Sequence, residues 1–405
     1  MKTFDLRRYL SYEVAITVLV LSFCMSALNS SLSELLHFQY SSLYTAASMY
    51  LPVLFSLGIF LTANRKAGVP LLDAKGLILL LFLCGFWLIN YFHEIGHVPS
   101  GSLSEYDQKR IWFFIQGVLL SGLVGLHAPK DSRHFIRCLL ISFCIISAIA
   151  SLSYLLTYRP GEDFVRLLGE RALGAGLVAC LGVGSCLALL LLHILGGRRL
   201  SGRLLVALVG GVLIHVAAIA LSATRGAALG ALASVTMFVW TARRSKALLP
   251  TLTLLILPFI GLIVLAKPYM PEATMRRLMM RHHGADIRYE LNRTMLDMII
   301  EHPCGRVLGY ENTKLSMNYS HNAFLQYIGE AGLLQMTPVM LVLLYGVVRN
   351  MVRHRADVHV QALGLFGLPV LIESFSAGSA YASLLWFLVF LVFSLRDDCG
   401  RMVPT

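Results

Sequence analysis

Long blocks of apolar residues alternate with short polar or basic breaks along the whole chain. Each block holds roughly 17 to 25 residues, enough for a helix to cross a hydrocarbon core of about 30 Å. The pattern predicts an all-α integral membrane protein with about twelve transmembrane helices. Their expected ranges are 13–29, 42–63, 75–92, 111–128, 135–157, 173–196, 204–222, 226–242, 248–266, 322–348, 359–376 and 380–395.

One polar segment, residues 267–321, is far longer than the other breaks and separates the ninth predicted span from the tenth. We expect it to be a large loop on the outer side of the membrane that contains short helices. No internal repeat and no proline-rich linker divides the chain. The sequence therefore predicts one polytopic membrane domain, residues 1–405, with residues 267–321 inserted as a loop.

Lys and Arg residues set the expected orientation, because short cytoplasmic loops collect them. With the N-terminus inside, every second break is basic, and the C-terminus is also cytoplasmic. The 20 inside residues, of 34 in all, are Lys2, Arg7, Arg8, Arg65, Lys66, Lys75, Lys130, Arg133, Arg137, Arg198, Arg199, Arg203, Arg243, Arg244, Lys246, Arg349, Arg353, Arg355, Arg396 and Arg401.

The composition supports a membrane protein, with 57% hydrophobic residues, 14% charged residues and a mean hydropathy of +0.71. An ordinary soluble globule does not have this make-up. The net charge of +12 follows largely from the basic cytoplasmic loops. We expect membrane lipids as neighbours and no nucleic-acid partner.

The eight cysteines indicate no disulfide framework and no metal centre. Six of them fall inside predicted spans, where a thiol packs as a small hydrophobe. Cys304 alone is clearly on the outer side, and no CxxC or Cys/His spacing indicates zinc. We expect neither a metal nor another cofactor.

The outer loop contains one helical pattern that begins near Asp286 and ends before Pro303 and Gly305. Arg288 would lie in the first turn, where the helix N-terminus already favours an anion. A guanidinium there predicts a phosphate site. The alternative is an ion pair of Arg288 with Asp286 or Glu290 on a wet surface.

A second arginine, Arg225, lies between the seventh and eighth predicted spans in the stretch LSATRGA. A turn of about four residues would hold its side chain at the outer membrane surface. Arg225 would then meet either the phosphate of an ordinary lipid or a substrate. The adjacent Gly226 permits close approach of a ligand.

His321 and Asn322 begin the tenth predicted span at the same outer surface. A histidine can accept a proton at neutral pH, and two arginines can hold a diphosphate bidentately. Together these groups suit transfer of a sugar from a lipid diphosphate. The alternative for His321 is a capping or packing role. Glu330 is expected to hydrogen bond between helices, and Glu373 is a candidate supporting residue near the outer end of its span.

The stretches SATRGAALG, GADIRYELNRTMLDMIIEHPCGRVLGY and SHNAFLQYIGEAGLL resemble the O-antigen ligase and polymerase superfamily of bacterial inner membranes. That family has an arginine opening the loop helix, a helix ending in His-Pro, and His-Asn on the next span. A tryptophan that relatives often carry after the arginine is absent from Tyr289–Asn292. The matching residues are Arg225, Arg288, His302, Pro303, Gly305, His321, Asn322, Glu330 and Gly332.

The resemblance implies a glycosyltransferase at the periplasmic face of a Gram-negative inner membrane. It would move O-antigen polysaccharide from undecaprenyl diphosphate to the lipid A core oligosaccharide in lipopolysaccharide synthesis, without a metal or other cofactor and with inversion. His321 would act on the acceptor hydroxyl, Arg225 and Arg288 would hold the departing diphosphate, and Asn322 would help to bind substrate. Glu330, Glu373 and His302 would support the site.

Three alternatives remain at the level of sequence. The first is an O-antigen polymerase or a protein O-oligosaccharyltransferase that uses the same lipid-linked donor. The second is a metal-dependent membrane glycosyltransferase, for which Glu105, Asp107, Glu162 and Asp163 are the acidic candidates outside. The third is a secondary transporter, which would use ionisable groups near the midplane such as His193, His215 or Glu330.

Overall fold

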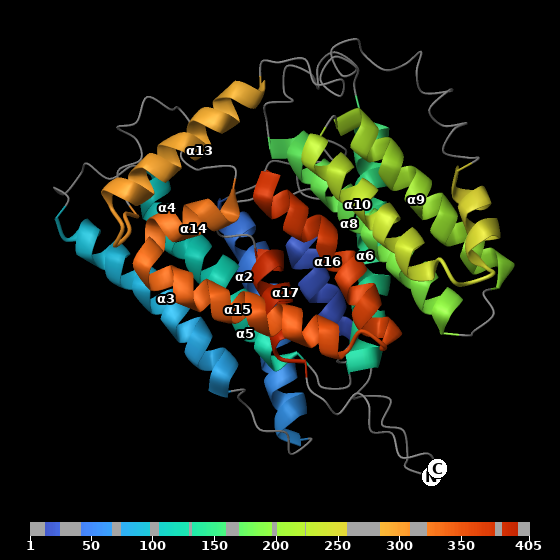
Figure 1. Cartoon of the computed structure of the whole chain (residues 1–405), viewed down its shortest axis with the longest axis horizontal. Helices are drawn as coiled ribbons and strands as arrows, with labels where there is room; N and C mark the ends of the chain where they lie inside the picture. The colour runs from blue at the N-terminus through green and yellow to red at the C-terminus, as the bar shows by residue number, and fades with distance from the viewer. Residues whose placement is uncertain are drawn as a thin grey trace. The chain divides into compact units, whose positions relative to one another are not determined.

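The computed structural model describes residues 13–24, 42–66, 74–97, 105–128, 132–158, 170–196, 201–222, 224–256, 284–307, 322–376 and 383–395. Within these ranges the chain forms helices joined by turns and contains no strand (Figure 1). The predicted all-α class is confirmed for this part of the chain.

The helices carry the membrane character that the hydropathy predicts. Seven helices in the described residues are long and apolar enough to cross a membrane, and three shorter helices are also apolar. The total of twelve spans stays a prediction. The seven are Ala74–Ile95, Arg110–His127, Arg133–Thr157, Gly174–Leu195, Gly202–Ser222, Leu333–Arg353 and Val358–Phe375, and the three shorter ones are Glu13–Cys24, Gly226–Ala242 and Ser383–Phe393.

The helices belong to two compact units, each built from three separate segments of the chain. Neither unit is a contiguous stretch of sequence, and α2 (Ser42–Lys66) runs from one into the other. Unit 1 comprises Met1–Ser56, Asp131–Arg281 and His354–Glu373, and unit 2 comprises Leu57–Lys130, His282–Arg353 and Ser374–Thr405.

Unit 1 is organised around α8 (Glu170–Leu195), which packs against three neighbouring helices. Glycine and alanine recur along α8, so other helices approach it closely, and most of the helix is buried. Its neighbours are α6 (Ser132–Thr157), α9 (Gly202–Ser222) and α10 (Arg225–Ala242); the unit also holds α16 (Val358–Ser376), the helix Glu13–Cys24 and a helix over 248–256.

Unit 2 has its core around the aromatic rings of Trp87, Phe114, Tyr327 and Trp386, all of them buried. One of its spans is interrupted by a turn of π-helix, η1 (Ile115–Leu120). Its other helices are α3 (Ala74–Ile95), α4 (Glu105–Phe114), α5 (Ser121–His127), α13 (Gly284–Glu301), α14 (Ala323–Ala331), α15 (Leu333–Arg353) and α17 (Ser383–Phe393).

One sequence-based boundary in unit 2 is wrong. The predicted span 322–348 is two helices, because Gly332 between α14 and α15 has a φ of +98°, which a continuing α-helix cannot contain. The predicted span 111–128 agrees with the candidate membrane span Arg110–His127, and its helix extends further toward the N-terminus, to Glu105.

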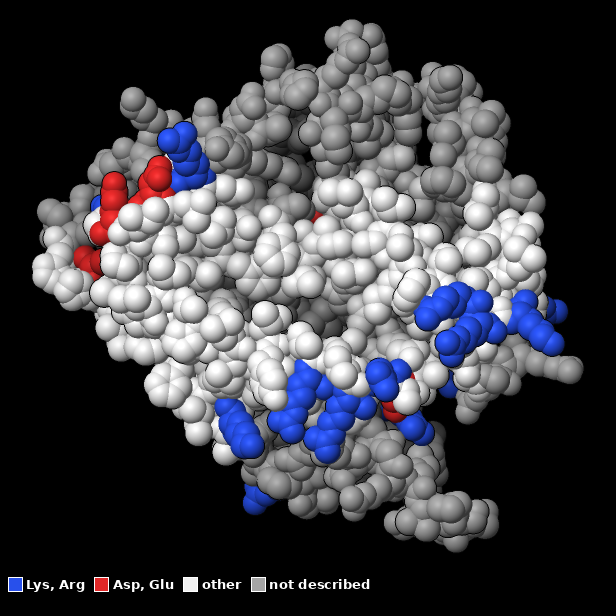
Figure 2. All heavy atoms as spheres, in the orientation of Figure 1, with Lys and Arg blue, Asp and Glu red and all other residues white. Residues whose placement is uncertain are grey.

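Helix ends in unit 2 fall into two groups. Gly76 at the start of α3 and Gly346 in the second half of α15 both face Phe393 of α17, and the basic residues Lys75, Arg349 and Arg353 belong to this end. The other end of α3 meets α14 and the turn that follows α13. In Figure 2, basic side chains lie over the end of α15, whereas acidic and basic side chains lie together over α13.

Unit 1 shows a similar division. At one end, Arg133 in the first turn of α6 contacts Asp357 just before α16, with Nε 3.3 Å from Oδ2. At the other end, Gly176 near the start of α8 faces Ser222 and Thr224 at the junction of α9 and α10. The alternation of basic breaks predicts that Arg133 and Asp357 lie on the same side of the membrane. It also predicts that Gly176 and the junction of α9 and α10 lie together on the opposite side.

Candidate functional site

The structure places the backbone of Arg225 at the start of α10. Helix α9 ends at Ser222 and α10 begins at Arg225, so the connecting turn is short, as the sequence predicted. Thr224 is extended, and its carbonyl accepts the first helical bond, from Ala228 N at 3.0 Å. Arg225 therefore follows a fixed turn at a helix N-terminus; its side chain is not among those described.

Small residues lock this turn onto α8. A Cβ atom built on Gly176 would lie 2.6 Å from Thr224 Oγ1 and 2.9 Å from Ser222 Oγ, so only glycine permits this contact. Both Ser222 and Thr224 are buried. The position of the α10 N-terminus is thus set by close packing within unit 1.

Arg288 lies in α13, one turn later than the sequence predicted. The helix begins at Gly284 rather than near Asp286, so Arg288 is in its second turn. The backbone of residues 284–290 is described, but their side chains are not. The predicted pairing of Arg288 with Asp286 or Glu290 stays open.

The second half of α13 packs on α14 through a glycine. A Cβ on Gly329 would lie 2.7 Å from Met295 Sδ and 2.8 Å from Met298 Cε. Met295 and Ile299 are buried, with Leu325 and Ile328 of α14 packed against them. The apolar stripe that predicted this helix is therefore the face that contacts α14.

The turn after α13 docks on the break between α14 and α15. Gly305 has a φ of +97° and lies against Gly332, since a Cβ on Gly305 would be 2.6 Å from Gly332 N. Arg306 N donates to Gly329 O at 2.9 Å. Asn90 of α3 secures both segments, donating to Cys304 O at 2.9 Å and to Glu330 O at 3.0 Å. The His-Pro-Cys-Gly motif is thus a structural clamp on α14.

A buried polar cluster of four side chains lies at α14. We call Trp87, Arg110, Gln326 and Glu330 the Glu330 cluster; each of them has no solvent exposure. Trp87 Nε1 donates to Glu330 Oε2 at 2.7 Å, and Gln326 Nε2 donates to Oε1 at 2.8 Å. Arg110 Nη1 lies 4.0 Å from Oε1. One carboxylate therefore ties α14 to both α3 and α4.

Ring stacking holds Trp87 in place for this contact. Its ring is 3.9 Å from that of Phe114, with an interplanar angle of 3°, and 5.2 Å from that of Tyr91. Phe114 precedes the π-helix η1, a distortion that often accompanies functional sites. Ring stacking therefore fixes the orientation of the Trp87 indole N–H that donates to Glu330.

Asn322 caps α14. Its Oδ1 accepts from Phe324 N and Leu325 N, each at 3.1 Å, and satisfies two N–H groups that the helix start leaves unpaired. His321 lies outside the described residues. The next residue, Asn322, has a fixed position, because it caps α14. The clamp and the Glu330 cluster hold that helix in place.

Two supporting candidates have clear surroundings. His302 Nε2 is 3.1 Å from Arg306 Nη1. A guanidinium only donates, so this nitrogen of His302 is the acceptor in that contact. Glu373 is buried on α16 near the end of that helix, in unit 1. Cys304, expected on the outer side, is exposed.

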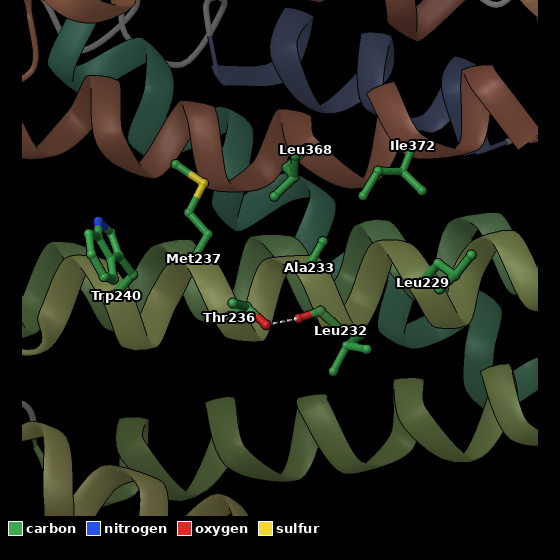
Figure 3. A pocket seen from close by; sticks show the side chains of 8 residues that line it. All are labelled: Leu229, Leu232, Ala233, Thr236, Met237, Trp240, Leu368 and Ile372. Atoms are coloured by element: carbon green, nitrogen blue, oxygen red, sulfur yellow. Dashed lines mark hydrogen bonds between the residues drawn. The ribbon is translucent and has the colours of Figure 1, made fainter.

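A shallow apolar groove of about 760 Å³ runs along α10 in unit 1. Figure 3 shows Leu229 and Trp240 at the two ends of the row on α10, with Leu368 and Ile372 facing them from α16. Thr236 donates its hydroxyl to Leu232 O at 2.9 Å. The groove suits a hydrocarbon chain rather than polar chemistry.

His215, a candidate for the transporter alternative, is a satisfied core residue. It is fully buried on α9, with Nδ1 2.9 Å from Ser151 Oγ and Nε2 3.5 Å from Ser147 Oγ. Gly182 of α8 packs directly against its ring. These contacts favour packing over ion or proton passage.

Sequence reasoning missed part of this arrangement. It left Arg110 just outside a predicted span and did not single out Trp87, Gln326 or Asn90. An arginine at the edge of an apolar run was the available signal. In the described residues, the side chains that approach one another closely enough for a metal ion are Glu13, His134 and Cys138 of unit 1.

The comparison with known families matches the part of the chain that carries these features. Residues 210–337 match the O-antigen ligase family, and this range includes Arg225, Arg288, His321, Asn322 and Glu330. No curated protein matches the sequence. Over residues 210–337 the chain is therefore similar to the O-antigen ligase family, and this similarity supports membership of that superfamily.

Proposed function

We propose that the protein transfers O-antigen polysaccharide from undecaprenyl diphosphate to the lipid A core oligosaccharide. The family covers O-antigen ligases and polymerases, so a glycosyltransferase-like enzyme is the common ground. The observation that carries the proposal is the anchoring of α14. A clamp, a cap and a buried carboxylate all fix the helix whose first residues follow His321.

In this mechanism His321 takes the proton from the acceptor hydroxyl as that oxygen attacks the anomeric carbon. The bond from the anomeric carbon to the diphosphate oxygen breaks in the same displacement, which inverts the configuration. Arg225 and Arg288 stabilise the negative charge that grows on the departing diphosphate. Asn322 fixes the helix start beside His321 and helps to bind the substrate.

The distribution of charge supports an active site on the periplasmic side of the inner membrane. In unit 2, α14 and the end of α13 lie at the end of α3 away from Lys75, and α15 ends in Arg349 and Arg353. Basic ends of spans favour the cytoplasm. The clamp and α14 then face the periplasm, and both chain termini lie in the cytoplasm.

The groove along α10 supports a lipid-linked donor. Leu229 at one end of the groove is one helical turn from Arg225, the residue that opens α10. The polyprenyl chain lies in this groove in our proposal, and its diphosphate reaches the α10 N-terminus. The substitution Ala233→Trp would fill the groove with a large side chain. It should raise the KM for the donor more than it lowers kcat.

A gene deletion separates the two activities of the family. Loss of a ligase leaves lipid-linked polymer accumulated and the lipopolysaccharide core uncapped, and plasmid-borne wild type restores capping. Loss of a polymerase leaves single repeat units and no polymer. The second pattern would replace the ligase proposal with the polymerase alternative.

A further inference from the structure

Unit 1 brings together an acidic, an imidazole and a thiol side chain that the proposed function does not use. Glu13 opens the helix Glu13–Cys24, and His134 and Cys138 are one turn apart on α6. His134 Nε2 lies 3.5 Å from Glu13 Oε1 and 3.4 Å from Cys138 Sγ. Cys138 Sγ lies 4.0 Å from the same Glu13 oxygen.

Two of these three separations match the geometry of a zinc site, and the third is slightly longer. Zinc bonds of about 2.0–2.1 Å to nitrogen, 2.0–2.2 Å to oxygen and 2.3 Å to sulfur at tetrahedral angles give edges of about 3.4 to 3.6 Å. The nitrogen–oxygen and nitrogen–sulfur distances, 3.5 and 3.4 Å, lie close to that range. The oxygen–sulfur distance of 4.0 Å closes to about 3.6 Å with a small side-chain rotation.

Packing between the two helices holds the ligand atoms at these distances. One turn beyond Glu13, Thr17 Oγ1 is 3.1 Å from Ser142 Oγ, one turn beyond Cys138. Farther along, the rings of Phe23 and Phe143 stack at 6.5 Å. The two helices therefore run side by side in the same direction, and the ligands meet at their N-terminal ends.

A third helix fixes the first one from another side. Ser56 of α2 donates its hydroxyl to Ala15 O at 2.8 Å, two residues from Glu13. Both His134 and Glu13 keep partial solvent exposure, 33% and 47% of their side chains. A metal ion therefore has a path to the cluster and a place for a water ligand.

We propose that Glu13, His134 and Cys138 bind one Zn²⁺ ion, with water as the fourth ligand. A thiolate with an imidazole favours zinc over the hard cations Mg²⁺ and Ca²⁺. Binding forms the zinc–sulfur bond and releases the thiol proton to solvent. No zinc motif is visible in the sequence, because the ligands come from two helices that lie more than a hundred residues apart in the chain.

This site is independent of the proposed transfer reaction. It lies at the start of α6, where Arg133 and Asp357 also meet, and not at the α9–α10 junction that carries Arg225. The ion pins the first helix to α6, and it stabilises the protein without taking part in chemistry.

The test uses the full-length protein, purified in detergent and stripped with a chelator. We expect one equivalent of Co²⁺ to give a thiolate-to-cobalt absorption band that Zn²⁺ removes. Cys138→Ser should abolish the band, and His134→Ala and Glu13→Gln should weaken Co²⁺ binding at least tenfold. Cys304→Ser, which removes an exposed thiol of unit 2, should leave the band unchanged.

Two further readouts do not depend on the variants. Zn²⁺ should raise the midpoint of thermal unfolding of the wild type, and X-ray absorption of the zinc-loaded protein should give one sulfur ligand at about 2.3 Å. Absence of a cobalt band would leave Glu13 and His134 as a simple ion pair. A band that survives Cys138→Ser, or a zinc ion with no sulfur or two, would equally overturn the site.

Discussion

Trp87 Nε1 donates a 2.7 Å hydrogen bond to Glu330 Oε2, joining residues 243 positions apart in the chain. The contact is fully buried and lies between α3 and α14. Arg110 from α4 places a positive charge near the same carboxylate. A buried charge needs such partners, so the presence of Glu330 here depends on the assembled unit.

Glu330→Gln should destabilise the protein by on the order of 3 kcal/mol, because Arg110 then lacks the nearby carboxylate while the volume hardly changes. Thermal unfolding in detergent measures this loss of stability. Polysaccharide transfer should also decrease, because α14 is held less firmly. Glu301→Gln, an exposed acid at the end of α13, is the matched control and should change neither. Wild-type stability of Glu330→Gln would mean that the Glu330 cluster does not hold α14.

Gly332→Ala should destabilise the clamp. Its φ of +98° disfavours any side chain, and a Cβ there would lie 2.6 Å from Cys304 O, a backbone atom that cannot move away alone. We expect a loss of more than about 1 kcal/mol in the free energy of unfolding. Gly85→Ala on α3, where nothing lies within 4 Å, should instead stabilise the helix by roughly 0.5–1 kcal/mol. Equal behaviour of the two variants would rule out a strained junction at Gly332.

Periodicity and hydropathy were sufficient for the local features. The apolar stripe of α13, the short turn before Arg225 and most helix ranges depend on neighbours in sequence, and the structure has them. The break at Gly332 was missed because an apolar run continues through it, and only the docking of Gly305 explains the turn.

The polar contacts between distant helices could not be predicted from local sequence patterns. Nothing in the surroundings of Arg110 in the chain reveals that Glu330 lies 4.0 Å away, since the two residues are far apart in sequence. The same holds for Glu13 with Cys138. Such pairs become visible only when helices from different parts of the chain are packed together.

Acid should weaken unit 1 through Asp357. A hydrogen bond from His359, helped by His359 N and by Arg133, lowers the pKa of Asp357 from 3.8 to about 2. A depressed pKa means that the carboxylate stabilises the folded state above about pH 4, and that this contribution disappears as the pH falls toward 2. Asp357→Asn should cost about 1 kcal/mol at pH 7, where the capping oxygen is charged.

Thermal unfolding of wild type and Asp357→Asn from pH 7 downward measures this effect. The two curves should converge as the pH drops below about 4. A difference that stays constant to the lowest pH would show that the charge of Asp357 contributes nothing. Asp297→Asn on α13 serves as the comparison.

Arg225→Lys and Arg288→Lys should each reduce transfer by on the order of 10² to 10³, because an ammonium cannot span two phosphate oxygens as a guanidinium does. Expression and folding should not change. If both residues hold one diphosphate, the double variant costs less free energy than the two single losses added. Strict additivity would indicate two separate sites, and a fully active Arg288→Lys would return that residue to a surface ion pair.

In our proposal this protein alone joins lipid-linked polysaccharide to the lipid A core, with His321 as the base. The most direct measurement is transfer by the purified protein, with saturating undecaprenyl-diphosphate-linked polymer and core lipid, for wild type, His321→Ala and the exposed-histidine control His97→Ala. We predict capped core lipid from wild type and His97→Ala, and none above background from a folded His321→Ala. Capping by His321→Ala at the wild-type rate would rule out His321 as the base, and no capping by the wild type with this donor and acceptor would rule out the proposed transfer.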